Sequence, residues 1–114
     1  MLDLTMQAIR ASLDGLAARQ RIIAQNLANA ETSGYLAQTV SFEQSLSSAL
    51  SVGDPTQRSI VTGLTGDPAH LNGNNVSVDS ETLAMGDTGL RYQLATESMN
   101  NKFRILHDAM RQDL

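Results

Sequence analysis

The chain has 114 residues, of which 41% are hydrophobic but only 4% aromatic, and it contains neither tryptophan nor cysteine. This length supports one domain at most, and its core must come from aliphatic side chains and methionine, which suits packed helices better than a sheet sandwich. The lack of cysteine excludes disulfides and thiolate metal sites, and the net charge of −4 argues against nucleic acid as the main partner.

No long apolar run is present that could span a membrane. The first residues, Met1 to Thr5, have neither a positive charge nor a continuous apolar block. We therefore expect no cleavable secretory signal and no transmembrane segment.

The first thirty residues place apolar side chains at alternating steps of four and three. This spacing is typical of a coiled-coil seam. It predicts a helix from about Leu2 to about Asn29, with Gly34 in a left-handed turn that follows it. The apolar seam residues are Leu2, Met6, Ile9, Leu13, Leu16, Ile23, Leu27 and Ala30.

Two residues interrupt this pattern. Gly15 weakens the helix by roughly 1 kcal/mol relative to alanine. Gln20 occupies a seam position, where a polar side chain either specifies the register of the helices or marks a point at which the seam turns toward solvent. The sequence leaves both interpretations open.

The middle of the chain is rich in serine, glycine and asparagine and has no sustained periodicity. We predict a polar loop over residues 34–78 with at most short strands, in which Val40, Phe42 and their neighbours could be extended and Phe42 to Leu50 could form a short helix. A loop of this length is uncommon in a compact domain, which indicates an interaction segment or one that a partner orders.

The last helix is expected to begin near Asp79, with Asp79 or Ser80 as the cap and Glu81 in the first turn. Its apolar spacing then continues to the end of the chain. We predict a mainly α fold in which two long terminal helices form a coiled coil, with segments 1–33, 34–78 and 79–114 making one assembly domain. The apolar residues of the last helix are Leu90, Tyr92, Met99, Phe103, Leu106, Met110 and Leu114.

Residues capable of catalysis are few and scattered. His70 and His107 are the only histidines, and neither has metal-ligand spacing with a second histidine. The pair Asp79 and Glu81 is explained by a helix N-terminus. We therefore expect no enzyme activity, no metal and no cofactor.

Asn26 and Asn29 lie three residues apart at the end of the first predicted helix, so they share a face. They either cap the helix or bind neighbouring backbone and set how the chain turns into the next segment. In the second case Tyr35 and Phe42 are the apolar anchors of that segment.

Two sequence blocks resemble a known family. Asn26-Leu27-Ala28-Asn29-Ala30-Glu31-Thr32-Ser33-Gly34-Tyr35 is similar to the N-terminal signature of the bacterial flagellar axial proteins, which form the rod and hook, although Ser33 stands where proline is frequent. Asn72-Gly73-Asn74-Asn75-Val76, followed by Val78-Asp79 and Leu90-Arg91-Tyr92-Gln93, resembles small subunits of the proximal rod. The motif residues are Asn26, Asn29, Gly34, Tyr35, Asn72, Gly73, Asn74 and Asn75.

The resemblance implies a structural, periplasmic subunit of the proximal rod, required for motility and exported by the flagellar type III apparatus. Its terminal helices would connect the membrane ring and export gate to the drive shaft by coiled-coil packing. The implied partners are other rod proteins, the adaptor FliE, export-gate and membrane-ring proteins and further copies of the chain. Two alternatives stay open: the neighbouring rod subunit FlgC, and a non-flagellar cytoplasmic coiled-coil regulator or chaperone.

Overall fold

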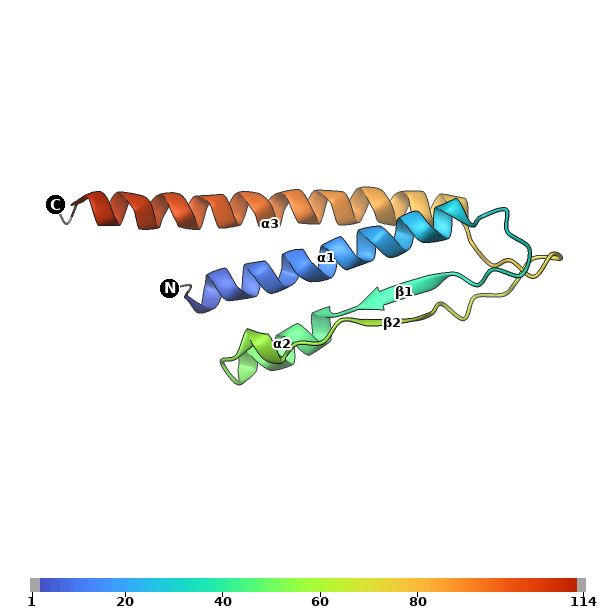
Figure 1. Cartoon of the computed structure of the whole chain (residues 1–114), viewed down its shortest axis with the longest axis horizontal. Helices are drawn as coiled ribbons and strands as arrows, with labels where there is room; N and C mark the ends of the chain where they lie inside the picture. The colour runs from blue at the N-terminus through green and yellow to red at the C-terminus, as the bar shows by residue number, and fades with distance from the viewer. Residues whose placement is uncertain (1–2, 113–114) are drawn as a thin grey trace.

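Two long antiparallel helices run along the structure, a computed structural model that describes residues 3–112 (Figure 1). The molecule measures 68 × 26 × 14 Å, and its radius of gyration of 18.0 Å exceeds the value of about 13 Å typical of a compact domain of this length. In chain order the elements are α1 (Leu4–Ala28), β1 (Gln38–Ser41), α2 (Glu43–Ser51), the 3-10 turn η1 (Pro55–Gln57), β2 (Val61–Leu64) and α3 (Val78–Gln112).

Helix α1 lies within the predicted range. The Asp3 carboxylate accepts a hydrogen bond of 2.7 Å from the backbone N–H of Met6, which satisfies one of the free amides at the helix start. The helix ends at Ala28, and Gly34 then has the predicted left-handed conformation, with φ of +77°. Leu2 lies outside the described residues.

Helix α3 begins one residue before its predicted start, and its cap differs from the prediction. The hydroxyl of Ser77 accepts from the backbone N–H of Ser80, so neither Asp79 nor Ser80 is the cap. Asp79 and Glu81 lie in the first turn, near the positive end of the helix dipole, as predicted. With 35 residues against 25, α3 is about 52 Å long and α1 about 37 Å. Helix α3 therefore extends past the start of α1 (Figure 1).

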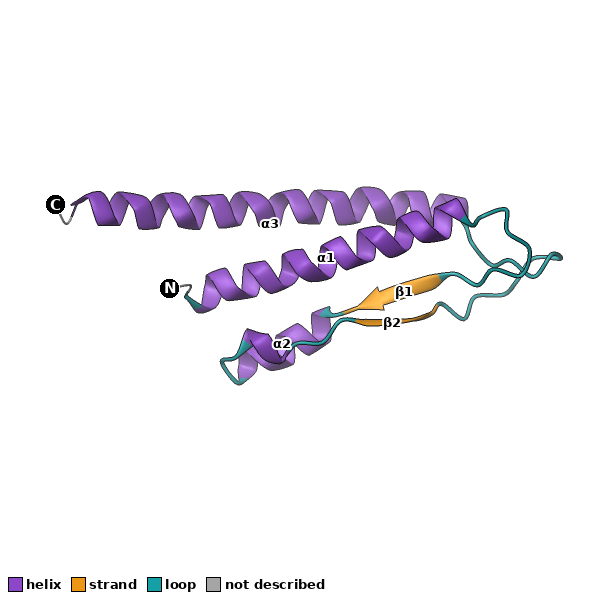
Figure 2. Ribbon diagram, in the orientation of Figure 1, coloured by secondary structure: helices purple, strands orange, loops and turns teal. Residues whose placement is uncertain are grey.

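The middle segment has more regular structure than a polar loop. Strands β1 and β2 form a short antiparallel pair in which Val40 lies opposite Thr62, and the nine residues of α2 form a helix (Figure 2). Val40 is therefore extended, as expected, and the expected short helix begins after Phe42, at Glu43. Leu46 and Ala49 are the buried residues of α2, and the serines around them hid this pattern in the sequence.

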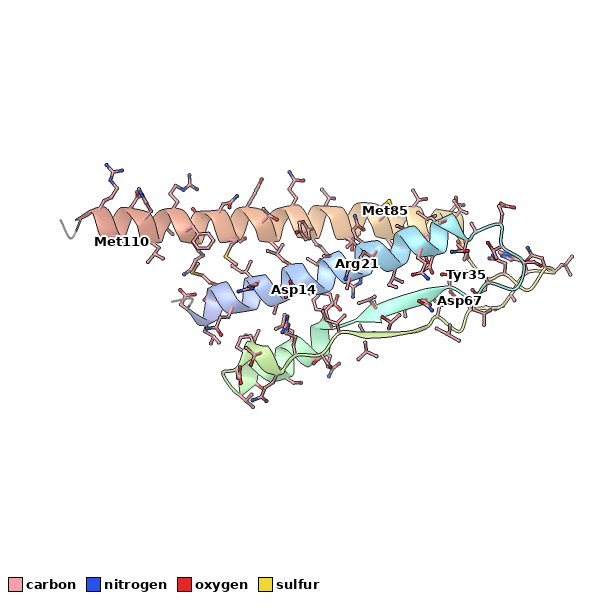
Figure 3. All side chains as sticks on the ribbon, in the orientation of Figure 1. Asp14, Arg21, Tyr35, Asp67, Met85 and Met110 are labelled. Carbon is pink, nitrogen blue, oxygen red and sulfur yellow. The ribbon has the colours of Figure 1, made fainter. Side chains whose placement is uncertain are left out.

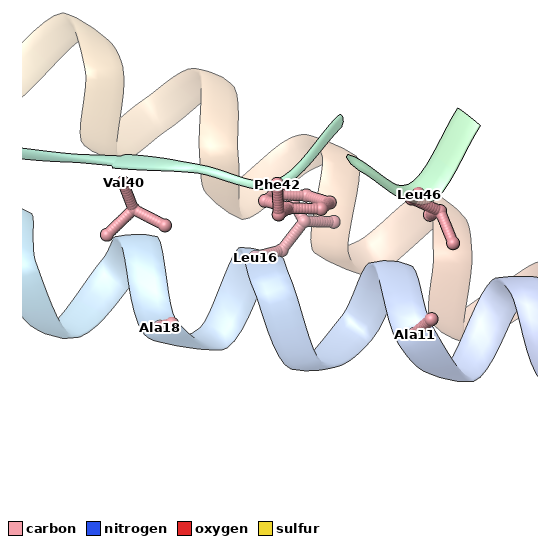
Figure 4. Close-up of a cluster of buried hydrophobic side chains, with 6 residues drawn as sticks. All are labelled: Ala11, Leu16, Ala18, Val40, Phe42 and Leu46. Atoms are coloured by element: carbon pink, nitrogen blue, oxygen red, sulfur yellow. The ribbon is translucent and has the colours of Figure 1, made fainter. Parts of the chain in front are cut away.

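Helix α1 lies between α3 on one side and the β1–α2 segment on the other (Figure 1). The hydrophobic core forms where α1 meets the β1–α2 segment. Its six buried members are Ala11, Leu16, Ala18, Val40, Phe42 and Leu46 (Figure 4).

Gly15 explains how the Phe42 ring reaches α1. A Cβ atom at position 15 would lie 2.4 Å from Cγ of Phe42, well inside van der Waals contact. The residue that weakens the helix locally is therefore the one that admits the only aromatic ring of the core.

Arg19 joins α1 to the start of α2. Its guanidinium donates two hydrogen bonds of 2.7 Å to the Glu43 carboxylate and one of 2.9 Å to the carbonyl of Val40. It also lies 4.9 Å from the centroid of the Phe42 ring. These hydrogen bonds lower the pKa of Glu43 from 4.5 to about 2.

The substitution Gly15→Ala tests the packing of Phe42. We expect it to lower the free energy of unfolding, because overpacking a core costs about 1–3 kcal/mol whereas alanine improves the helix by only about 1 kcal/mol. Urea denaturation measures the effect. Gly86→Ala is the control, because no atom lies within 4 Å of the new Cβ, and it should stabilise the chain. Stabilisation by both substitutions would contradict the role of Gly15.

The Arg19–Glu43 pair should make stability depend on pH. Because the pKa of Glu43 is lower in the folded chain, the pair stabilises fully above pH 4.5, and this contribution is lost as the pH falls toward 2. The Glu43 side chain is 57% exposed, so the loss should be about 1 kcal/mol or less. Urea titrations over this pH range measure how steeply the free energy of unfolding falls with decreasing pH. This fall should be shallower in Glu43→Gln than in the wild-type chain, and equally shallow in Arg19→Met. An unchanged slope in both variants would refute the linkage.

Candidate assembly interface

Asn26 ties the end of α1 to the start of β1. Its side chain is completely buried. The amide nitrogen donates to the carbonyl of Gln38 at 2.8 Å, and the amide oxygen accepts from the N–H of Gln38 at 3.0 Å and from the Tyr35 hydroxyl at 3.2 Å. The side chain therefore pairs with an extended backbone as a neighbouring strand does, which supports the interpretation that Asn26 sets the exit from α1.

Asn29 has the capping role. It is the residue at which α1 ends, and its amide nitrogen donates to the carbonyl of Gln25 at 2.9 Å. The two asparagines of the first motif block thus have different roles, although they are only three residues apart: Asn26 binds the start of β1, and Asn29 caps α1.

Asn74 brings the second motif block onto the first. Only 1% of it is exposed, and its amide nitrogen donates to the carbonyls of Asn29 and Thr32 at 2.8 and 2.7 Å. Its amide oxygen accepts from the N–H of Val76 at 2.7 Å. One side chain therefore binds two carbonyls of the turn that follows α1 and orients the backbone that leads into α3.

The turn before Asn74 is held against Gly34. The carbonyl of Asn72 accepts from the N–H of Gly34 at 2.9 Å and from the hydroxyl of Ser33 at 3.0 Å. Gly73 has φ of +84°, and a Cβ there would lie 3.2 Å from Cα of Gly34. The close contact with Gly34 and the positive φ both favour glycine at position 73. At position 34 a Cβ would meet no atom within 4 Å, so the φ of +77° is the reason for glycine there.

Asn75 completes the junction on the strand side. Its amide oxygen accepts from the N–H of Ala37 at 2.6 Å, and its amide nitrogen donates to the carbonyl of Asp67 at 3.0 Å. Tyr35 and Asp67, labelled in Figure 3, both lie at this loop end of the molecule. We name the side chains of Asn26, Asn74 and Asn75 the asparagine clamp.

The candidate interface residues on the two terminal helices fall into three groups. Met6, Leu16 and Ile23 are buried within this chain, and each exposes 5% or less of its surface. Ile9, Leu13, Leu27 and Met99 are half-buried. The exposed members are Leu90, Tyr92, Phe103, Leu106 and Met110.

Three exposed apolar residues of α3 escaped the sequence analysis. Leu83, Leu94 and Ile105 lie with Leu90 on one face of the helix, about 160–220° around the axis from Tyr92 at 3.6 residues per turn. Thr88, by contrast, is buried. We name Leu83, Leu90, Leu94 and Ile105 the outer stripe. Their spacing of seven, four and eleven residues is the signal that could have revealed them.

Gln20 lies within the contact between α1 and α3. Its amide nitrogen is 3.7 Å from the position of a Cβ built on Gly89, and its amide oxygen is buried without a hydrogen-bond partner among residues 3–112. This places the side chain inside the seam and not on the solvent side. A buried acceptor without a partner weakens the contact that it occupies.

His70 and His107 are both exposed. In the described part of the chain, no three His, Cys, Asp or Glu side chains are grouped so as to hold a metal ion. Within the same residues, no helix is both long and apolar enough to cross a membrane.

The substitution Asn74→Ala tests the asparagine clamp. It removes three hydrogen bonds and leaves the buried N–H of Val76 without a partner, while the carbonyls of Asn29 and Thr32 keep their backbone donors. A lost hydrogen bond costs about 0.5–1.5 kcal/mol, and an unsatisfied buried group about 1–3 kcal/mol. We expect the free energy of unfolding to fall by about 2–4 kcal/mol, measured by urea denaturation. Asn100→Ala, at an exposed position of α3, is the control and should change stability by less than about 0.5 kcal/mol. Equal effects of the two substitutions would disprove the clamp.

Comparison with known proteins places this arrangement in a family. No family model matches the chain. The chain is 34% identical over 117 residues to the flagellar basal body rod protein FlgB of Bacillus subtilis, covering 90% of this chain and 89% of that protein. FlgB of Escherichia coli is 26% identical and FlgB of Salmonella typhimurium 27%, each over 91% of this chain and 93% of the relative. The chain therefore belongs to the family of the flagellar basal body rod protein FlgB.

Proposed function

We propose that this FlgB-family chain is a non-enzymatic subunit of the proximal rod that joins the membrane ring and export gate to the drive shaft. Membership of the family makes it a structural component of the flagellar basal body rod. The more specific position within the rod is our inference from the motif blocks and from the surfaces of the terminal helices.

The apolar surface of α3 is the observation that carries the proposal. The outer stripe is exposed along α3, and Phe103, Leu106 and Met110 are exposed near the C-terminal end. We name these last three the end stripe. Large side chains gathered in this way on an elongated molecule are typical of a surface that a partner covers.

Neighbouring rod subunits would cover these stripes by packing helix on helix. Fully burying one Leu, Ile, Met or Phe side chain contributes roughly 1.5–3 kcal/mol, so several such contacts per subunit are enough for a stable assembly. We propose coiled-coil packing between neighbouring chains, in one assembly domain that comprises both terminal helices and the segment between them.

The partners follow from this position. We propose further copies of the chain, other rod proteins, the adaptor FliE and proteins of the export gate and membrane ring, reached after export through the flagellar type III apparatus. The relatives reported above carry the FlgB name, which does not favour FlgC or a cytoplasmic coiled-coil regulator as the alternative.

Fractionation of the source bacterium tests the proposal. A tagged wild-type chain, replacing the chromosomal copy, should copurify with detergent-extracted basal bodies and support swimming. Leu90→Asp should remove the chain from basal bodies and abolish swimming, because a carboxylate on the outer stripe cannot be buried against an apolar neighbour.

The matched control is Asn101→Asp, which places the same carboxylate at an exposed polar position of α3. It should retain both copurification and swimming, and circular dichroism of both purified variants should report a folded chain. A wild-type chain found only in the soluble fraction would refute the proposed function.

A further inference from the structure

A groove opens where α1, α2 and α3 meet. It has a volume of about 470 Å³ and is lined by all three helices. The walls are mainly apolar, with Ile9 and Leu16 from α1, Leu46 and Leu50 from α2, and Leu94 from α3. The outer stripe thus reaches the edge of this groove through Leu94.

The chain itself carries a segment suited to this groove. The ion pair between Lys102 Nζ and Asp3 Oδ2, at 3.2 Å, lies at the start of α1. Beyond it α3 continues alone, and the end stripe follows at spacings of three and four residues, the pattern of an amphipathic helix that inserts into a groove. Met110, labelled in Figure 3, lies on this free end past the start of α1.

The lengths agree. The groove-lining residues run from Ile9 to Leu16 on α1 and from Arg91 to Ser98 on α3. Each range covers eight residues, and its end residues are seven positions apart, or about 10.5 Å along the helix. The end stripe, from Phe103 to Met110, has the same span.

The charges are also complementary. Residues 101–114 contain Lys102, Arg104 and Arg111 against Asp108 and Asp113, which is three positive and two negative charges, or +1. The remaining 100 residues hold 8 − 3 = 5 positive and 12 − 2 = 10 negative charges, or −5. The end of one copy is therefore attracted to the body of another.

The occupant cannot be the same molecule. Leu94 and Ser98 form one wall of the groove, and Phe103 follows on the same uninterrupted helix. A continuous helix cannot fold back into a groove that its own preceding turns help to form.

We propose that the C-terminal end of α3 from one copy of this chain docks into the α1–α2–α3 groove of a second copy. This inference rests on the proposed function, because it names one of the contacts through which subunits assemble. The contact joins two different surfaces, so it repeats head to tail and produces a chain or ring of subunits instead of a closed two-fold dimer.

Cysteine cross-linking of the full-length chain tests the contact, because the sequence has no native cysteine. Ser47→Cys lines the groove and Leu106→Cys lies in the middle of the end stripe. When the two purified variants are mixed and mildly oxidised, we expect a disulfide-linked heterodimer. The controls are Ser48→Cys, on exposed α2 surface outside the groove, and Ile105→Cys, on the outer stripe. Each control mixture should give at least ten-fold less heterodimer.

A second measurement avoids the cross-link. Sedimentation of the wild-type chain should show an average mass that rises with concentration beyond that of a dimer. Ser47→Trp, which fills the groove, and Phe103→Asp should each weaken association at least ten-fold, whereas Ser48→Trp and Asn101→Asp, at exposed polar positions of α2 and α3, should not.

Efficient cross-linking in the control mixtures, or equal association of all four variants, would overturn the docking contact. If cross-linking fails while the wild-type chain copurifies with basal bodies, only the docking contact is refuted. If the chain is absent from basal bodies, the proposed function is refuted, whatever the cross-linking result.

Discussion

The thinness of the molecule is the constraint on which the rest of its structure depends. With a smallest extent of 14 Å, it is only about one helix and its side chains thick. Helix α1 has neighbours on two sides, whereas α3 packs against α1 alone among the described elements. Apolar residues on any other face of α3 must therefore meet solvent or another molecule. The exposed stripes follow from this geometry as directly as from the sequence.

In a core this thin, apolar packing alone cannot fix the positions of the helices and strands relative to one another. The asparagine clamp does so with hydrogen bonds. Its three buried amides bind backbone groups of the turn after α1, of the start of β1 and of the entry to α3. Buried hydrogen bonds are directional, so they specify one arrangement of these segments where apolar contacts would permit several. The clamp sets the loop end of the molecule, while Gly15, Phe42 and Arg19 set the position of the β1–α2 segment along α1.

Much of the helical part was predictable. The spacing of apolar residues determined both terminal helices to within a few residues, because it depends only on 3.6 residues per turn. Helix α2 could not be decided in the same way, since its five-serine neighbourhood supports a helix only when Leu46 and Ala49 meet α1. The role of Gly15 could not be predicted either. Helix propensity shows only that glycine destabilises the helix, whereas the position of the Phe42 ring shows that a side chain at position 15 would clash.

The sequence by itself determined the fold class, the two helices and the motif blocks that indicate the family, because these depend on local periodicity and on residue identity. Only the tertiary structure decided which apolar residues are buried within the chain and which are exposed. Met6, Leu16 and Ile23 are buried, while the residues of the outer and end stripes are exposed. Periodicity identifies an apolar face but not the molecule that covers it. That depends on how far α3 extends past α1 and on where α2 lies, which are properties of contacts between residues far apart in the chain.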